Sequence, residues 1–548
     1  GDGSALTGIA AGFSADADKN LFANNTCSGC NLDGSSGCFN VFLGACAGKA
    51  VTSGAFNITI GHKAGQTMTT GERNVFLGDY AGFGNGSSSG TKNIVVGYAA
   101  GYVLANASEN ILMGSVAGYS ITSGSYNVIL GKNAGTQLTQ CHYNVFIGAY
   151  AGKCVTTGTS NIAIGKEAGG GGANSASTGA QNISIGSGTA QELTSGGCNT
   201  AVGYGAGFEH TTGCFNVTMG ALAGHQICTG SYNIAFGYYA GCDIKQGQWN
   251  VMMGSCAGRN RENTCNNIFI GRVAGCCEGT GGDNIGIGRE ALKGAGGSHE
   301  FNIALGKSAG QALTDGTHNF FGGYKAGFNV TTGQRNIAIG DKASSAGTLT
   351  GSNNITLGYF SGKCLSSGNN NIFLGLYAGC KVTTNPDNVA IGNMAGYRIT
   401  GAGNVAIGKA ALADDHSGSN NFVGGYHAGT NMKCGSSCNV VIGGKAGTCL
   451  LCGCFNFIVG CCVNVPDGNG SCQLAIGVGN YRWLSGDSNF NVGIGTTNPD
   501  GAVGAALTSK LSVGIVSAYQ FYGDASQMTG AGFTQDSNCN LIAGKCAG

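Results

Sequence analysis

Cysteine has the widest chemical repertoire of the residue types in this sequence, and 26 of the 548 residues are cysteine. Cys27 and Cys30 form a Cys-x-x-Cys motif, which is typical of metal sites and redox pairs. A structural zinc site needs four ligands, but no second Cys pair accompanies the motif and the eight His do not group around it. The sequence therefore predicts no metal site and no cofactor.

Three pairs of cysteines are separated by 16 to 18 residues: Cys364 with Cys380, Cys438 with Cys454, and Cys434 with Cys452. In a coiled repeat of about that length, the members of each pair would lie in adjacent coils, about 4.8 Å apart. This distance falls within the Cα separation of a disulfide, about 4.4–6.8 Å. Disulfides between coils are one interpretation; free thiols that fill space as small apolar groups are the other.

The residue patterns of enzymes are missing. No Ser-His-Asp arrangement and no pair of carboxylates suited to acid-base catalysis stands out, and the Gly-rich segments lack the Lys-Ser/Thr of a phosphate loop. We therefore expect no catalytic residues and no enzymatic activity.

Asparagine opens a five-residue run that returns throughout the chain, first as Asn40-Val41-Phe42-Leu43-Gly44. From residue 40 to residue 491 the run occurs 27 times, with Gly always fifth and Asn first in every copy except that of Gln473. Stacked copies would align the Asn side chains in a column whose amides hydrogen-bond along the stack; a turn residue without that role is the alternative. Members of this column include Asn40, Asn57, Asn74, Asn127, Asn161, Asn233, Asn267, Asn336, Asn371 and Asn404.

The elements that must position these side chains follow from the repeat, since 19 of its 26 steps are 17 residues long. The unit reads N-[IV]-x-[ILM]-G-x-x-A-G-x-x-[ILV]-T-[ST]-G-x-x. Apolar positions 2 and 4 around a variable position 3 indicate a strand with one buried face, and apolar position 12 indicates a second strand. The sequence predicts an all-β protein, a parallel β-solenoid (β-roll or β-helix) of about 27 coils with two short strands in each.

Short spacers are expected at both ends of the solenoid. We divide the chain into a spacer or cap (1–39), the solenoid rod (40–495), a spacer with possible intertwined strands (496–539) and the start of a further repeat (540–548). Gly1–Gly8 nearly repeats Gly523–Gly530, so the two end segments look like halves of one recurring spacer. We therefore expect this chain to be one segment of a longer fibre.

The composition excludes several other classes of protein. Gly makes up 105 residues but Pro only 3, which excludes collagen, and a hydrophobic share of 42% excludes a disordered linker. The net charge of +1 indicates neither a nucleic-acid partner nor a charged membrane surface.

The repeat resembles those of tail-fibre and other virion structural proteins of marine cyanobacterial phages. The run Val492–Pro499, followed by Lys510–Val513, is similar to a junction in such fibres, and Cys472–Gly477 with Trp483 fits the same family. More distantly, the Ile-Gly and Ala-Gly units resemble the β-roll heads of trimeric autotransporter adhesins. The resemblance implies a rigid homotrimeric fibre in the virion that serves host attachment, with an unidentified cell-surface receptor or glycan as partner.

Two other functions fit the repeat. An extracellular filament subunit, with copies joined end to end, or a cell-surface adhesin would use the same rod. Ice binding is a remote alternative, because Thr52, Thr69 and Thr122 at position 13 would form a Thr column. An ice-binding face needs two Thr ranks pointing the same way, whereas position 14 points to the opposite face of a strand.

Overall fold

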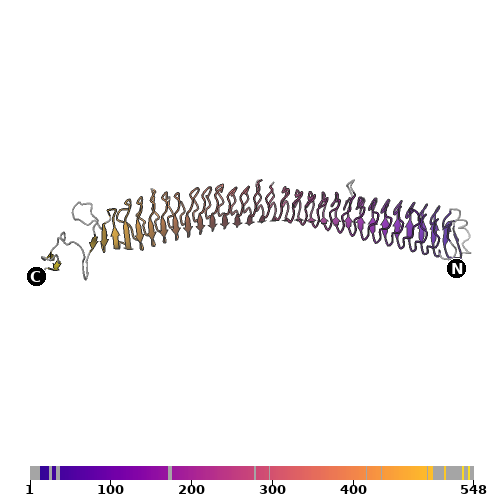
Figure 1. Ribbon diagram of the computed structural model, residues 1–548, viewed down its shortest axis with the longest axis horizontal. Helices are drawn as coiled ribbons and strands as arrows, with labels where there is room; N and C mark the ends of the chain where they lie inside the picture. Colours follow the sequence, from indigo (N-terminus) through magenta and orange to yellow (C-terminus); the bar gives the residue numbers. More distant parts are fainter. Residues whose placement is uncertain are drawn as a thin grey trace.

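The chain folds into one long, gently curved rod of stacked coils, as the computed structural model shows (Figure 1). The structure describes residues 13–497 except 24–26, 33–36, 171–175, 277–278, 295, 415, 434 and 490, together with the backbone of 511–513, 533–535 and 541–543. The described residues contain strands, turns and bends but no helix, so the predicted all-β class is confirmed.

One mostly parallel sheet of 31 strands runs the length of the rod, usually with one three-residue strand from each coil, and the last two described strands form a separate sheet. The strands are β1 (Phe13–Ala15), β2 (Leu21–Ala23), β3 (Val41–Leu43), β4 (Ile58–Ile60), β5 (Val75–Leu77), β6 (Ile94–Val96), β7 (Ile111–Met113), β8 (Val128–Leu130), β9 (Val145–Ile147), β10 (Ile162–Ile164), β11 (Ile183–Ile185), β12 (Thr200–Val202), β13 (Val217–Met219), β14 (Ile234–Phe236), β15 (Val251–Met253), β16 (Ile268–Ile270), β17 (Ile285–Ile287), β18 (Ile303–Leu305), β19 (Phe320–Gly322), β20 (Ile337–Ile339), β21 (Ile355–Leu357), β22 (Ile372–Leu374), β23 (Val389–Ile391), β24 (Val405–Ile407), β25 (Phe422–Gly424), β26 (Val440–Ile442), β27 (Phe457–Val459), β28 (Leu474–Val478), β29 (Tyr481–Gly486), β30 (Val492–Ile494), β31 (Leu511–Val513), β32 (Phe533–Gln535) and β33 (Leu541–Ala543).

Each strand pairs with its counterpart in the next coil, position for position. Ile58 of β4 lies opposite Val75 of β5, and the same register runs from β3 to β28. Longer coils keep this register: Ile162 of β10 still lies opposite Ile183 of β11, across a step of 21 residues. The predicted parallel β-solenoid with a 17-residue repeat is confirmed, with about 26 stacked turns.

The second strand expected at position 12 of each coil is absent from the described coils. That side of the coil is made of turns, with isolated parallel bridges at four places, such as Met68 with Ser88 and Val330 with Leu349. Glycines and residues with positive φ bracket this short stretch, for example Gly65 with a φ of +59°. Because such conformations interrupt extended backbone on both sides, position 12 contributes a buried side chain without a continuous strand.

Position 3 of the strand, rather than positions 2 and 4, faces the core, which corrects the expected orientation. Phe321 and Phe373 are fully buried at position 3, and they alternate with small residues such as Ala304 and Ala338 in neighbouring coils. Ala fills position 8 and keeps the core narrow, so the largest side chains at position 3, such as Phe321, fit where small ones lie above or below them. This interdigitation explains why position 3 looks variable in the sequence although it is the buried one.

Antiparallel hairpins stand at both ends of the stack. β1 pairs antiparallel with β2, which then pairs parallel with β3, and β29 pairs antiparallel with both β28 and β30. In the first hairpin Asp16 accepts hydrogen bonds from the backbone N–H and side-chain Nδ2 of Asn20, at 2.8 and 2.9 Å. Asp487 and Asn491 repeat that arrangement in the second, at 3.0 and 2.8 Å.

The same hairpin recurs beyond the rod. β32 and β33 pair antiparallel in the register of β1 with β2, and in each case five residues from Asp to Asn join the two strands. β31 adds to β30 in parallel, as β3 adds to β2. Most of the predicted spacer 496–539 lies outside the described residues. The segment 540–548 contains β33.

Candidate functional site: the outer face of the sheet

The outer face of the sheet is the most uniform surface of the rod. Positions 2 and 4 of β3 to β28 are Val, Ile, Leu, Met or Phe in every strand, apart from Thr200, Gly322 and Gly424. Many of these side chains remain 36–49% exposed, among them Ile60, Phe236 and Leu357. No charged residue interrupts the two ranks in these 26 strands. We call these two ranks the outer apolar face.

The area of this face is large for an exposed apolar surface. Twenty-six strands at about 4.8 Å give a length of roughly 125 Å, and three residues at about 3.3 Å give a width of roughly 10 Å. The resulting area of roughly 1,200 Å² exceeds the largest apolar patch of an ordinary monomer, about 300–600 Å². It also exceeds the roughly 800 Å² that each partner contributes to a stable protein interface. The outer apolar face is therefore a candidate assembly surface.

Aromatic stacks flank the face at position 17, directly before the Asn. Tyr232 stacks on Phe215 at 5.0 Å and on Trp249 at 4.0 Å, and Phe39 stacks on Phe56 at 5.1 Å. These residues hold positive φ, for example +60° at Trp249, which costs a side chain more than it would cost glycine. Stacking of exposed rings along the rod offsets part of that cost and extends the apolar surface beyond the strands.

The Asn residues form a ladder that runs beneath the sheet. Asn57 donates from its backbone N–H and from Nδ2 to Oδ1 of Asn40, at 2.9 and 3.0 Å, and the pattern repeats from coil to coil. Nδ2 also donates to the carbonyl of Gly71, fourteen residues further along the same coil, at 2.8 Å. Each Asn thus joins two coils and braces its own. The structure places all the following column members in buried positions: Asn40, Asn57, Asn74, Asn127, Asn161, Asn233, Asn267, Asn336, Asn371 and Asn404.

The ladder also explains why the substitution by Gln473 falls in the last coil of the parallel stack. The backbone N–H of Gln473 still donates to Oδ1 of Asn456 at 2.8 Å. Its longer side chain turns aside, and Oε1 accepts from the N–H of Asp467 at 3.0 Å. The backbone of Gln473 therefore bonds to the preceding Asn, but its side-chain amide bonds to a loop and does not continue the ladder. The next strand, β29, pairs antiparallel with β28.

Three histidines interrupt the apolar column at position 12 and its equivalents. Burial lowers the pKa of His210 to about 4 and that of His416 to about 4. Burial, together with the charge of Arg261, lowers the pKa of His299 to about 3. Nε2 of His299 lies 2.8 Å from Nη2 of Arg261 and so accepts from it, while Nδ1 lies 3.1 Å from the carbonyl of Thr314 and donates to it. All three imidazoles are therefore neutral in the folded rod at pH 7.

These histidines predict a loss of stability in mild acid. The unfolded chain takes up protons below its ordinary His pKa of about 6.5, whereas the folded rod does not until about pH 4 or lower. Stability is complete above pH 6.5, and each buried His should cost about 2 kcal/mol by pH 5. His210→Leu introduces an apolar side chain like those of its column neighbours Leu193 and Ile227. It should remove the pH-dependent loss of stability that one buried histidine causes. Urea unfolding at pH 8 and pH 5 checks this, and an equal pH dependence in the variant and the parent would contradict it.

Cys364, Cys380, Cys438 and Cys454 are free thiols in this structure. Cys434, the predicted partner of Cys452, lies outside the described residues. Burial raises the pKa of Cys380 to about 11, which keeps this thiol protonated and unreactive. The Sγ atoms of Cys27 and Cys30 lie 2.7 Å apart at the exposed start of the rod.

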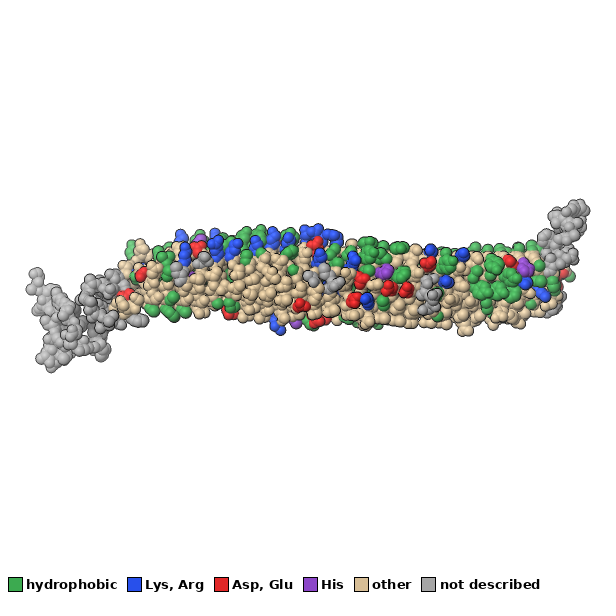
Figure 2. All heavy atoms as spheres, turned by 90° about the horizontal axis from the view of Figure 1, so that it is seen from above, with side chains coloured by type: hydrophobic (Ala, Val, Ile, Leu, Met, Phe, Trp, Pro, Cys, Tyr) green, Lys and Arg blue, Asp and Glu red, His purple; other side chains and the backbone are tan. Residues whose placement is uncertain are grey.

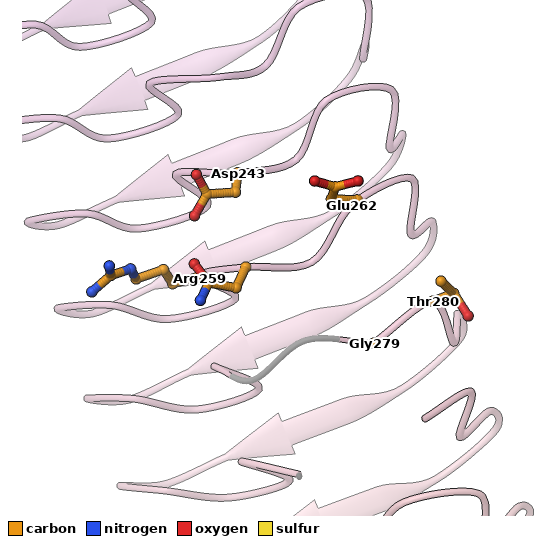
Figure 3. A pocket seen from close by; sticks show the side chains of 6 residues that line it. Asp243, Arg259, Glu262, Gly279 and Thr280 are labelled. Carbon is orange, nitrogen blue, oxygen red and sulfur yellow. The ribbon is translucent and has the colours of Figure 1, made fainter. Parts of the chain in front are cut away.

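One open pocket of about 600 Å³ lies between coils, as Figure 3 shows. Its lining includes Asp243, Arg259 and Glu262, but Glu262 is paired with Lys245 at 2.5 Å and Arg259 lies over the ring of Tyr239 at 5.2 Å. Glu262 and Arg259 are thus both in contact with neighbours within the rod. Nowhere in the described part of the chain do three His, Cys, Asp or Glu side chains cluster as metal ligands.

No protein-family model matches the sequence, and no curated protein matches it. Among the described residues, no helix is long and apolar enough to cross a membrane.

Proposed function

We propose that this chain is a structural rather than a catalytic protein, the rigid rod of a fibre in which copies pack side by side through the outer apolar face. The observation that carries the proposal is this uncharged face of roughly 1,200 Å², repeated at about 4.8 Å. Burying such a surface would stabilise an assembly far more than a single rod in water.

A second copy of the chain is the occupant that fits the face best. Two rods with the same coil spacing bring side-chain rows of equal period together, so that rows of one can fill the furrows of the other along the whole length. A globular partner has no such period. We propose a homotrimer because the repeat resembles those of trimeric fibres; in this arrangement three rods turn one outer apolar face each toward a common axis.

Lateral packing is favoured over end-to-end joining of solenoids. An open sheet edge would invite another chain to add a strand. Here the parallel register of the coils gives way to antiparallel pairing at both ends, of β1 with β2 and of β28 with β29. A further solenoid coil would therefore not continue the register of the stack, while the outer face remains open along its length.

For the biological setting, we propose a phage tail fibre or other virion appendage that serves host attachment, on the strength of the repeat's resemblance to such fibres. An extracellular filament subunit or cell-surface adhesin, placed outside the cell, is the second candidate and would use the same rod. Immunogold labelling with antibodies to the rod separates them: we expect gold on appendages of virions from the source. Labelling confined to cell envelopes or free filaments would contradict the virion assignment.

Ice binding receives no support from the threonines at position 13. Thr52 donates its hydroxyl to the carbonyl of Thr69 at 3.3 Å, and Thr211 donates to that of Cys228 at 2.8 Å. These hydroxyls hold adjacent coils together and so are not free to order water at the surface.

A further inference from the structure

A band of cations and aromatic rings runs along the C-terminal half of the rod. Figure 2 shows Lys and Arg side chains in a line along one edge of that half, beside hydrophobic side chains. Eight of the nine coils that start between Asn302 and Asn439 carry one of these cations, at position 6, 7, 10 or 11, and none of the eight is buried. We call this band the basic ridge, and its cations are Lys307, Lys325, Lys342, Lys363, Lys381, Arg398, Lys409 and Lys445.

Cations outnumber acidic residues along the ridge. Between Lys307 and Lys445 the same positions hold two acidic residues, Asp341 and Asp414, against eight cations. None of the eight cations forms an ion pair with any described residue, whereas Arg272 and Arg289, in the two coils that precede the ridge, both lie within 4 Å of Glu290. The ridge therefore carries uncompensated positive charge on a rod whose net charge is only +1.

Five of the eight ridge cations lie over aromatic rings instead. Lys325 Nζ lies 5.5 Å from the ring centre of Tyr324 and 4.9 Å from that of Phe328. Lys342 and Lys363 approach the ring of Phe360 at 5.1 and 4.4 Å. Such cation–π contacts fix the position of an ammonium group without neutralising it. The exposed hydroxyl-bearing rings of Tyr324, Tyr359 and Tyr426 add hydrogen-bonding groups to the same surface.

From this arrangement we infer that the basic ridge binds a linear anionic polysaccharide along the rod. Carboxylate or sulfate groups of the glycan pair with the ridge cations, sugar hydroxyls bond the tyrosine hydroxyls, and the apolar faces of sugar rings pack on exposed ring surfaces. Coils repeat at about 4.8 Å, so the ridge offers binding groups at short, even steps to a polymer that is itself a repeat. Multiple weak contacts along one chain then add up to useful affinity.

The glycan fits better than a nucleic acid. Nucleic-acid surfaces are usually strongly basic as whole domains, with a pI above about 9, whereas this chain has a pI of about 7.4. The inference rests on the proposed function, because a fibre outside the cell meets anionic glycans. The ridge lies beside the outer apolar face rather than on it, so packing of that face leaves the ridge cations accessible in the assembly.

Isothermal titration with an oligomer of a uronic acid tests the inference, with the carboxyl-reduced neutral oligomer of equal length as ligand control. We expect the full chain to bind the charged oligomer at least about tenfold more tightly than the neutral one, and less tightly as NaCl rises. The variant Lys325→Glu, Lys342→Glu, Lys363→Glu should lose about tenfold or more in affinity. The matched control Lys49→Glu, Lys132→Glu, Lys153→Glu, at positions 6 and 10 of the N-terminal half, should change it less than about twofold.

Several results would overturn the inference: no binding, equal affinity for the charged and neutral oligomers, or equal losses in the two triple variants. Tighter binding of single-stranded DNA of the same charge would overturn it in favour of a nucleic acid. Sedimentation of the same samples separates this failure from failure of the proposed function. Assembly without glycan binding overturns the inference alone, whereas monomeric rods would contradict the proposed fibre.

Discussion

Replacing Ile234, Ile287 and Leu357 together with lysine is expected to abolish assembly and leave the single rod folded. These side chains are already 41, 40 and 43% exposed in the single chain, so lysine there meets water and not the core. In an assembly each would bury an unpaired charge, at a cost of several kcal/mol. We expect the association constant to fall at least about a thousandfold, which sedimentation velocity will measure.

The matched control places lysine at exposed sites away from the face. Ser195, Thr332 and Ser367 occupy position 14 of three coils and are exposed. Their replacement by lysine adds the same charge to the rod but leaves the outer apolar face intact, so assembly should persist. If both triple variants dissociate equally, net charge and not the face governs association. If neither dissociates, copies do not meet through this face.

The second large effect is expected from Asn388→Ala in the ladder. Nδ2 of Asn388 donates to the carbonyl of Gly401 at 3.0 Å, and Oδ1 accepts from the backbone N–H of Asn404 at 3.0 Å. Alanine leaves these buried groups without partners, and each orphan costs about 1–3 kcal/mol. We expect a local loss of about 3 kcal/mol, seen as hydrogen exchange about a hundredfold faster in the adjoining coils.

Asn393→Ala in the same coil is the control. Asn393 lies at position 6, partly exposed, and its side chain makes no hydrogen bond within the described residues. Exchange in the adjoining coils should therefore stay within about twofold of the parent. Equal protection in the two variants would show that the coils stack without help from the ladder.

The architecture was predictable because the same residue pattern recurs in every coil. Gly at position 5 recurs in all 27 copies, and the structure explains why: Gly61 has a φ of +134°, and a Cβ there would lie 2.3 Å from the carbonyl oxygen of Gly78. Every coil imposes the same requirement on its neighbour. The uniform Asn follows from the same stacking, since only a side chain with both donor and acceptor can continue the ladder.

The orientation of the strand was not predictable from hydrophobic alternation, and the proposed function depends on it. Ile58 and Ile60 look like core residues, while Thr59 between them looks like a surface residue, yet Thr59 is buried and both isoleucines are exposed. Alternation of apolar and polar residues distinguishes the two faces of a strand. It does not show which face is exposed to solvent when the exposed face is also apolar. One signal in the sequence indicated the correct orientation: side chains at positions 2 and 4 are uniformly large, whereas those at position 3 vary in size.

The end hairpins were also missed, because a single Asp four residues before an Asn is too common to stand out. Only the paired hydrogen bonds of Asp16 with Asn20 and of Asp487 with Asn491 show that the motif belongs to a hairpin at each end of the stack. The basic ridge went unnoticed for a related reason: its lysines are far apart in the sequence and come together only when coils stack.

Cryo-EM of the purified full chain tests the central claim most directly. The account predicts three rods around one axis, with the outer faces of β3 to β28 turned inward and the coils spaced at about 4.8 Å. Single rods with that face in solvent, or rods packed through another side, would contradict it.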